Sequence, residues 1–173
     1  VQEALPSSIT NATYVIIGEG LAAYNYNGAW VGSLADNNYG GFKSGKGYWF
    51  KIRTEAVCPD IAEGEPCNEL IDFEYNEPSG NVDARLVNSS LPSIPEGFEY
   101  TQSTAQGFYF IESASFDGVE AVAGDWIVAY NDNVVVGSWP WTGEFTTVPA
   151  MGYDGTQETA GYMEEGQLPT FKL

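Results

Sequence analysis

The acidic side chains of the C-terminal part of the chain are the residues whose types and spacing best suit chemistry. Asp154 opens an oxygen-rich turn that contains Glu158, and Glu165 is the twelfth residue when Asp154 is counted as the first. Calcium binds such carboxylate and carbonyl oxygens. An EF-hand needs glycine at its sixth position, which is Thr159 here, so we expect either a looser calcium loop on Asp154, Glu158 and Glu165 or an ordinary solvated turn.

The same carboxylates raise the hypothesis of a hydrolase. A glycoside hydrolase uses one carboxylic acid and one carboxylate that face each other across the bound sugar. The chain has 24 acidic residues, so acidic pairs arise from composition alone and the sequence singles out no such pair. A carboxylate-based glycoside hydrolase therefore ranks third among the functions considered, with no catalytic residue named.

Aromatic residues offer a second kind of chemistry. Pro140 fixes the backbone between Trp139 and Trp141, and Tyr153 lies in the loop that follows. Exposed aromatic rings stack on sugars, so we interpret Trp139, Trp141 and Tyr153 as a candidate carbohydrate-binding set. The alternative is that the two indoles close the end of the hydrophobic core. Trp30 and Trp49 lie inside strand patterns and are expected in the core.

Two features of the composition exclude whole classes of function. The chain has no histidine, which removes Ser-His and Cys-His nucleophile pairs and the commonest zinc ligand. Its formal net charge of −18 repels phosphate backbones and anionic lipid, so we expect neither nucleic-acid partners nor membrane insertion. Such a surface suits divalent cations or cationic partners, or serves solubility alone.

The basic residues are unevenly placed. Four of the six lie between Lys43 and Arg53. This segment either meets an acidic patch on a neighbouring molecule or balances the carboxylates of its own chain. Its Gly-Lys-Gly triplet lacks the spacing of a phosphate-binding loop, so no nucleotide site is expected.

The two cysteines predict the compartment. Cys58 and Cys67 enclose a short acidic loop with proline and glycine, which indicates a local disulfide and export from the reducing cytoplasm. The first residue is Val1 rather than methionine, so we expect that a leader has been removed. We therefore expect an extracellular or cell-surface protein, with a virion surface as a further setting.

The elements that must position these residues are short strands. Runs of β-branched and aromatic residues alternate with Gly, Asn and Pro turns, and no apolar 3.6-residue period lasts beyond two turns. The first thirteen residues are expected to be extended. We predict an all-β antiparallel sandwich of jelly-roll type, with strands at 14–17, 21–24, 29–34, 48–53, 69–75, 98–100, 108–111, 126–130, 134–136 and 169–173.

One hairpin motif occurs twice. AYNYNGAWVGSL at 23–34 aligns with AYNDNVVVGSW at 129–139 after one deletion at the turn. Since residues 77–97 are rich in Pro, Ser and Asn, we predict two related modules, 1–90 and 91–173, which either pack as one unit or stand apart. The alternative is convergence, because hairpins commonly use these residue types.

The last predicted strand suggests assembly. A chain that stops on a strand is either cut from a longer protein or leaves that strand for pairing with a neighbour. We therefore assign a candidate assembly role to Pro169, Phe171 and Leu173.

Several stretches carry a resemblance: GDWIVAYNDNVVVGSW, TTVPAMGYDG, TAGYMEEGQLPTFKL, FEYTQSTAQGFYFIESASFDG, YVIIGEGLAAYNYNGAWVGSL and GKGYWFKI. Together they cover most of the chain. The sequence resembles repeated, largely uncharacterised β-rich domains of secreted and cell-surface proteins of marine and environmental bacteria, with similar modules in some phage virion proteins. The resemblance implies extracellular display and carries no catalytic residues.

These observations lead to three ranked expectations. The first is a non-catalytic extracellular structural or adhesive module, not an enzyme, that assembles with copies of itself or another surface protein into a fibre or array. The second is a carbohydrate-binding module with a calcium-stabilised loop. The hydrolase is third.

Overall fold

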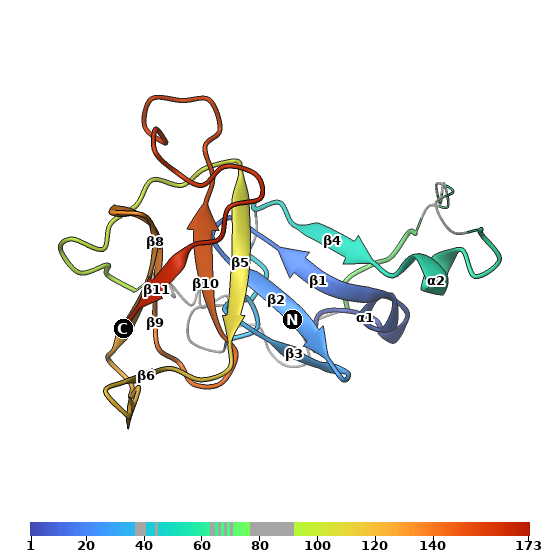
Figure 1. Cartoon of the computed structure of the whole chain (residues 1–173). Coiled ribbons are helices and arrows are strands. Elements are labelled where there is room, and N and C mark those ends of the chain that lie inside the picture. Colours follow the sequence, from blue (N-terminus) through green and yellow to red (C-terminus); the bar gives the residue numbers. More distant parts are fainter. Residues whose placement is uncertain are drawn as a thin grey trace. The chain divides into compact units, whose positions relative to one another are not determined.

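The structure is a computed structural model that describes residues 1–36, 41–43, 45–62, 65, 67, 69, 71–76 and 92–173 (Figure 1). The chain divides into two compact units, Val1–Ser89 (unit 1) and Ser90–Leu173 (unit 2). The described elements are mainly strands in antiparallel sheets, which confirms the all-β fold class. The sandwich or jelly-roll arrangement stays a prediction.

Unit 1 is built on a four-stranded antiparallel sheet with the strand order β3-β2-β1-β4. Its strands form from β-branched and aromatic runs that glycine or asparagine turns interrupt. The predicted hairpin is present, with Asn27 and Gly28 at its turn and Tyr26 opposite Ala29. The elements are α1 (Ser7–Ala12), β1 (Thr13–Ile17), β2 (Ala22–Tyr26), β3 (Ala29–Val31), β4 (Trp49–Ile52) and α2 (Thr54–Val57).

The N-terminal segment differs from the expectation. It was expected to be extended, but it contains helix α1, which places Ile9 and Ala12 in the core of unit 1. Pro6 occupies the cap position before this helix, where its missing N–H costs nothing. Burial of one apolar face has thus outweighed the polar composition of a segment too short for a periodic signal.

Two further expectations for unit 1 are wrong. Trp49 is not a core residue, because its side chain is 67% exposed; along β4 the inward positions belong to Phe50 and Ile52. The strand expected at 69–75 is absent over the described residues 71–75, and residue 70 lies outside the described part. Here Phe73 and Tyr75 pack by their rings, so packing holds this segment without strand pairing.

The described part of unit 2, residues 92–173, contains seven strands in three small sheets (Figure 1). The predicted hairpin of β8 and β9 is confirmed, and β11 pairs with β8 on the side opposite β9. The strand expected at 98–100 is irregular. The strands are β5 (Gln106–Ile111), β6 (Ser115–Phe116), β7 (Val119–Glu120), β8 (Trp126–Asn131), β9 (Val134–Pro140), β10 (Thr146–Met151) and β11 (Thr170–Lys172).

The core of unit 2 forms where β9 approaches β10. All six residues of β10 are buried. At the closest point a Cβ on Gly137 would lie 1.7 Å from the carbonyl oxygen of Pro149, so only glycine permits this backbone approach. On its other edge β10 pairs with β5, from Thr146 opposite Ile111 to Met151 opposite Gln106. This pairing fixes the ends of both strands, where the candidate site lies.

Candidate functional site

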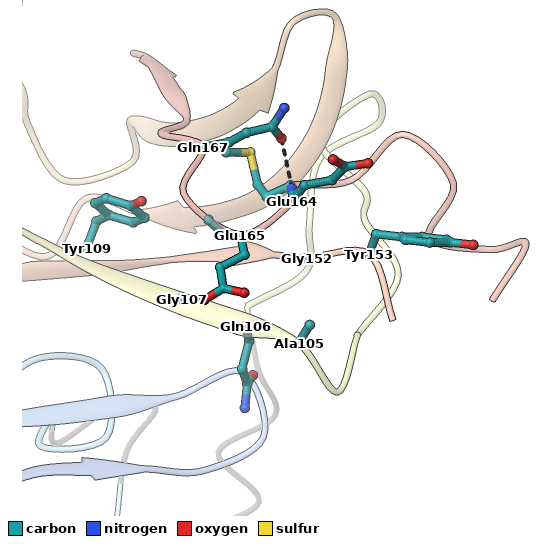
Figure 2. Close-up of a pocket in the computed structure, with 11 residues that line it drawn as sticks. Ala105, Gln106, Gly107, Tyr109, Gly152, Tyr153, Glu164, Glu165 and Gln167 are labelled. Carbon is teal, nitrogen blue, oxygen red and sulfur yellow. Dashed lines mark hydrogen bonds between the residues drawn. The ribbon is translucent and has the colours of Figure 1, made fainter. Parts of the chain in front are cut away.

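A groove of about 480 Å³ opens at one end of β5 and β10 in unit 2 (Figure 2). We call it the Tyr153 groove. Its floor comes from the two strand ends, and its wall comes from the loop that joins β10 to β11. The lining residues are Ala105, Gln106, Gly107, Tyr109, Ala150, Gly152, Tyr153, Met163, Glu164, Glu165 and Gln167.

The backbone ties both ends of the wall to the strands. The Gly152 amide donates to the carbonyl oxygen of Ala105 at 2.7 Å, and the Tyr153 amide donates to that of Met163 at 2.8 Å. The buried Ser103 hydroxyl donates to the Gly152 carbonyl oxygen at 2.7 Å. The loop therefore leaves β10 and returns at Met163 along a fixed path.

Asp154 closes the outer part of this loop. Its Oδ1 accepts hydrogen bonds from the hydroxyls of Thr156 and Thr159, both at 2.7 Å, and from the Thr156 amide at 3.2 Å. Its Oδ2 accepts from the Thr104 amide at 3.4 Å. Hydrogen bonds to the charged form hold the pKa of Asp154 below its usual range, with the Thr159 and Thr156 hydroxyls as the main causes.

Asn131 holds the loop from the hairpin side. Its amide nitrogen Nδ2 donates to the carbonyl oxygens of Gly161 at 3.0 Å and Tyr162 at 3.3 Å. A second hollow of about 320 Å³ lies beside these contacts and shares Tyr153, Glu164 and Gln167 with the Tyr153 groove. The two hollows therefore flank the same stretch of loop.

Two tyrosine rings give the groove its apolar surface. Tyr109 is half-buried and meets Phe171 of β11 edge to face, with 5.1 Å between ring centroids. Tyr153 is 49% exposed. In Figure 2 the two rings stand on opposite sides of Glu165. The groove thus combines one half-buried ring, which packs against Phe171, with one that extends into solvent.

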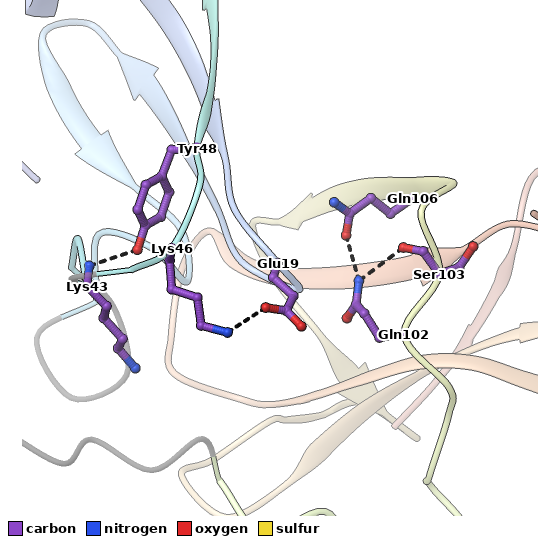
Figure 3. Close-up of polar contacts among 7 residues, drawn as sticks. All are labelled: Glu19, Lys43, Lys46, Tyr48, Gln102, Ser103 and Gln106. Carbon is purple, nitrogen blue, oxygen red and sulfur yellow. Dashed lines mark hydrogen bonds and ion pairs between the residues drawn. The ribbon is translucent and has the colours of Figure 1, made fainter.

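The polar groups of the groove come from the returning loop. Glu164, Glu165 and Gln167 are exposed, and the Glu164 amide donates to Oε1 of Gln167 at 2.8 Å. Figure 2 shows the Glu165 carboxylate directed toward β5 at Gly107. Gln106 points away from it, and its Oε1 accepts from Nε2 of Gln102 at 2.9 Å (Figure 3).

The structure does not gather the residues expected to bind calcium. Asp154 directs its oxygens at hydroxyl and amide donors, and Glu158 lines neither hollow. Glu165 lies in the Tyr153 groove instead. Among the described residues, no group of three or more His, Cys, Asp or Glu side chains is placed to hold a metal ion. Calcium binding stays a hypothesis.

The expected carbohydrate-binding set is divided by the fold. Trp139 is only 4% exposed, so its indole belongs to the core and presents no face to a sugar; this corrects the expectation. Trp141 is half-buried, donates its backbone amide to the Asp125 carbonyl oxygen at 2.8 Å, and lines neither hollow. Tyr153 alone of the three lies in a groove.

Sequence reasoning missed Tyr109, Glu164 and Gln167. Tyr109 lies within a run that predicts a buried strand, which gives no sign that one edge of its ring borders a groove. Glu164 and Gln167 flank Glu165, the expected calcium ligand, in the sequence. The polar cluster that follows Tyr162-Met163 was therefore the one sequence feature that could have indicated the groove.

The residues expected to mediate assembly lie at the edge of a sheet. Phe171 and Leu173 are exposed and Pro169 is half-buried. The strand β11 does pair, but with β8 of its own chain, from Thr170 opposite Tyr130 to Lys172 opposite Val128. Its other side is the outer edge of the three-stranded sheet.

The basic segment of unit 1 makes contacts within its own unit. Lys46 forms an ion pair with Glu19 at 2.7 Å, and the Lys43 amide donates to the Tyr48 hydroxyl at 2.8 Å (Figure 3). Lys51 and Arg53 both lie over the ring of Tyr14, at 5.3 and 5.7 Å from its centroid. The side-chain charges of Lys46, Lys51 and Arg53 therefore have partners within unit 1.

The expected disulfide between Cys58 and Cys67 is present. A disulfide in so small a unit indicates an oxidising environment. None of the helices that the structure describes is long and apolar enough to cross a membrane.

Three comparisons with known proteins add no relative. No protein-family model, curated protein or solved structure matches the chain. The resemblance to bacterial surface domains therefore stays a prediction, and the site must be interpreted from its own geometry.

Proposed function

We propose that the protein is a non-catalytic, extracellular adhesive module that binds carbohydrate in the Tyr153 groove. The observation that carries this proposal is the groove itself, in which Tyr109 and Tyr153 flank a hollow edged by Glu164, Glu165 and Gln167. The groove also lies on the unit with the expected assembly strand, so adhesion and display involve the same part of the chain.

The chemistry of the lining suits a sugar. A pyranose has apolar C–H faces that pack on aromatic rings and hydroxyls that need hydrogen-bond partners around the rim. Carboxylate oxygens accept from such hydroxyls, and the amide nitrogen of Gln167 donates to them. The volume of about 480 Å³ lies within the roughly 300–1,000 Å³ that small-ligand sites occupy.

The proposed setting rests on the disulfide and on charge. The Cys58–Cys67 bond favours an oxidising compartment, and a net charge of −18 favours solubility and disfavours contact with anionic lipid. Both fit a module that is displayed outside the cell, on a virion or on another surface.

The test is a glycan array on the full chain, followed by calorimetry with the best oligosaccharide. We expect Tyr153→Ala to weaken binding by about tenfold, the equivalent of roughly 1.4 kcal/mol for one stacked ring. The matched control is Tyr26→Ala in unit 1, since Tyr26 is 44% exposed and Tyr153 is 49% exposed. An equal loss in both variants would remove the assignment to the groove.

The same samples separate binding from hydrolysis. The oligosaccharide is incubated with the protein and its length is followed by mass spectrometry. Intact oligosaccharide agrees with a binding module. Shortened product that disappears on Glu165→Gln would replace the proposal with the hydrolase hypothesis.

A second candidate role is self-assembly through β11. Its outer edge has backbone groups that no described strand pairs, and Leu168, Phe171 and Leu173 are exposed beside it. Such edges template pairing with another chain unless they are protected. A second copy would extend the three-stranded sheet.

Sedimentation velocity over a range of protein concentrations tests this role. We expect association that Phe171→Pro reduces, because proline removes one strand N–H donor. The control is Val119→Pro on the exposed two-stranded ribbon β6–β7, which lies outside this sheet. A monomer at every concentration would exclude assembly through β11 and leave the binding proposal standing.

A further inference from the structure

We infer that the carbohydrate bound in the Tyr153 groove carries a protonated amine, as in an oligomer of glucosamine. This inference rests on the proposed carbohydrate binding and adds the chemical class of the ligand. It follows from three features of unit 2: its charge balance, the contact of its only lysine, and the placement of Glu165 between the tyrosine rings with Glu164 on the wall.

The charge of unit 2 is strongly one-sided. This unit holds 12 of the 24 acidic residues of the chain but one of its six basic residues, Lys172. Because negative potential accumulates at a concave surface, it raises the local concentration of cations and lowers that of anions. Sulfated and uronic-acid glycans are therefore disfavoured before any contact is made.

Lys172 lies over a ring and not against the groove carboxylates. Its Nζ lies over the ring of Tyr130, 4.3 Å from the centroid, in a cation–π contact. No ion pair joins Glu164 or Glu165 to another of the described residues. Among the described residues, the lining of the groove thus has two carboxylates and no lysine or arginine.

The position of the carboxylates relates them to a stacked sugar. Glu165 lies between Tyr109 and Tyr153 and is directed across the floor toward Gly107, whereas Glu164 lies on the wall (Figure 2). A sugar that packs on either ring therefore presents its substituents to a carboxylate. An ammonium group gains a charge-assisted hydrogen bond there and favourable contact with the tyrosine face.

An acetylated or neutral sugar gains less from the same surface. Its hydroxyls and amides donate to Glu164 and Glu165 through hydrogen bonds in which only the acceptor is charged, whereas an ammonium group adds the attraction between opposite charges. Such a ligand also leaves the two negative charges unbalanced. The groove should therefore discriminate between two oligomers that differ by acetylation alone.

The experiment uses the full chain and two ligands of equal length, β-1,4-linked glucosamine hexamer and its fully N-acetylated form. Calorimetry is run at about pH 5.5, above the roughly 4.3 of an ordinary glutamate and below the roughly 7.7 of an α-amino group, so that carboxylates and amines are charged. We expect the glucosamine hexamer to bind about tenfold more tightly, and raised salt to reduce this preference.

Variants locate the preference within the groove. Glu165→Gln should narrow the difference between the two ligands, because it weakens binding of the glucosamine hexamer more than binding of the acetylated hexamer. Glu158→Gln is the matched control, since it removes the same charge from the same loop but lies outside both hollows. Thermal unfolding of each variant shows that its fold is intact.

The outcomes separate this inference from the proposed function. Equal affinity for both hexamers would overturn the inference and leave carbohydrate binding in place. Failure of both hexamers and of every glycan on the array would overturn the proposed function. Equal competition by a lysine hexapeptide would also overturn the inference, because it would show a site for cationic peptides in general.

Discussion

The hairpins β2–β3 and β8–β9 start from nearly the same residues and use them differently. In both, an asparagine shortly before the turn donates its amide to two backbone carbonyl oxygens. Asn25 donates to Thr10 at 2.8 Å and Thr13 at 3.2 Å, which fixes the junction of α1 and β1. Asn131 donates to Gly161 and Tyr162, which fixes the loop that forms the wall of the groove.

The glycine and serine of the shared motif differ as well. Gly32 adopts a φ of 105°, which side chains rarely tolerate, whereas Gly137 is needed because Pro149 leaves no room for a Cβ. Ser33 accepts from the Ala22 amide of its own hairpin at 3.1 Å, and Ser138 donates to the Phe98 carbonyl oxygen at 3.0 Å. The same residue types thus serve different structural purposes in the two hairpins.

The shared motif therefore specifies the hairpin itself, whereas the neighbouring elements decide what each of its side chains contacts. In unit 1 the strand β2 lies between β3 and β1, while in unit 2 the strand β8 lies between β11 and β9. Duplication of an ancestral module stays a hypothesis.

The two glycines should differ most. Gly137→Ala forces β9 and β10 apart. We therefore expect it to lower the free energy of unfolding by more than about 4 kcal/mol or to prevent folding. Gly32→Ala meets the backbone strain of a positive φ, which costs about 1–3 kcal/mol of stability. Denaturant unfolding measures both. Equal losses would show that the two glycines serve the same purpose.

The two asparagines should affect different properties. Asn25 is 6% exposed, so Asn25→Ala leaves buried carbonyl oxygens unpaired and costs about 2–3 kcal/mol of stability. Asn131→Ala exposes its partners to water and costs about 1 kcal/mol, yet it loosens the wall of the groove and weakens oligosaccharide binding. Unfolding and calorimetry on the same samples measure both effects. A ligand affinity that Asn25→Ala lowers as much as Asn131→Ala would contradict the assignment.

Alkaline pH should act mainly on unit 2. Burial, followed by the charge of Tyr162, raises the pKa of Tyr100 from 10.0 to about 12. The folded state therefore keeps its proton after the unfolded state has lost it. The contribution of Tyr100 to the free energy of unfolding is fully present below pH 10. It falls as pH rises toward 12, by at most about 3 kcal/mol.

Tyr75 provides the comparison in unit 1. Burial raises its pKa too, but this residue is exposed, so its contribution is smaller. Urea unfolding between pH 9 and 12 should show a decline that Tyr100→Phe removes and Tyr75→Phe leaves nearly intact. The reverse pattern would contradict the burial argument.

Acid should loosen the Asp154 loop by a smaller amount. The pKa of Asp154 is lowered in the folded state, so its stabilisation is complete above the ordinary value of 3.8 and is lost as pH falls below it. Protection of the Thr156 amide from hydrogen exchange, relative to its intrinsic rate at each pH, should fall in this range. An Asp154→Asn variant should show low protection at every pH, and high protection in that variant would show that the carboxylate is dispensable.

Calcium removal should have the smallest effect. The carboxylate of Asp154 already accepts four hydrogen bonds, from Thr104, Thr156 and Thr159. We therefore expect the melting temperature to be the same in EDTA and in calcium. A melting temperature that is several degrees higher in calcium than in EDTA, with no such difference in Asp154→Ala, would support calcium binding by this loop.

Much of the local structure follows from the sequence. β-branched runs predict β1 and β8–β9. Asn27-Gly28 predicts the turn between β2 and β3, and Asp117-Gly118 predicts the turn between β6 and β7, because these residues tolerate positive φ. The cysteine spacing predicts the disulfide. Local residue types decide each of these features, so one segment is enough to recognise them.

Features decided by packing were harder to predict. Helix α1 depends on a core that its own residues do not reveal, and Trp49 is exposed because β4 turns Phe50 inward. The Tyr153 groove joins residues from β5, β10 and the loop before β11, which the sequence does not show to be neighbours. Trp139, the most conspicuous aromatic candidate, is buried by the same packing that leaves Tyr153 exposed.

The most direct test of carbohydrate binding in unit 2 is an NMR titration of the full chain with the glucosamine hexamer. The account predicts saturable shifts for the amides of Tyr109, Tyr153 and Glu165, and unchanged positions for those of Tyr26 and Trp49 in unit 1. Shifts confined to unit 1, or an unchanged spectrum at millimolar ligand, would contradict it.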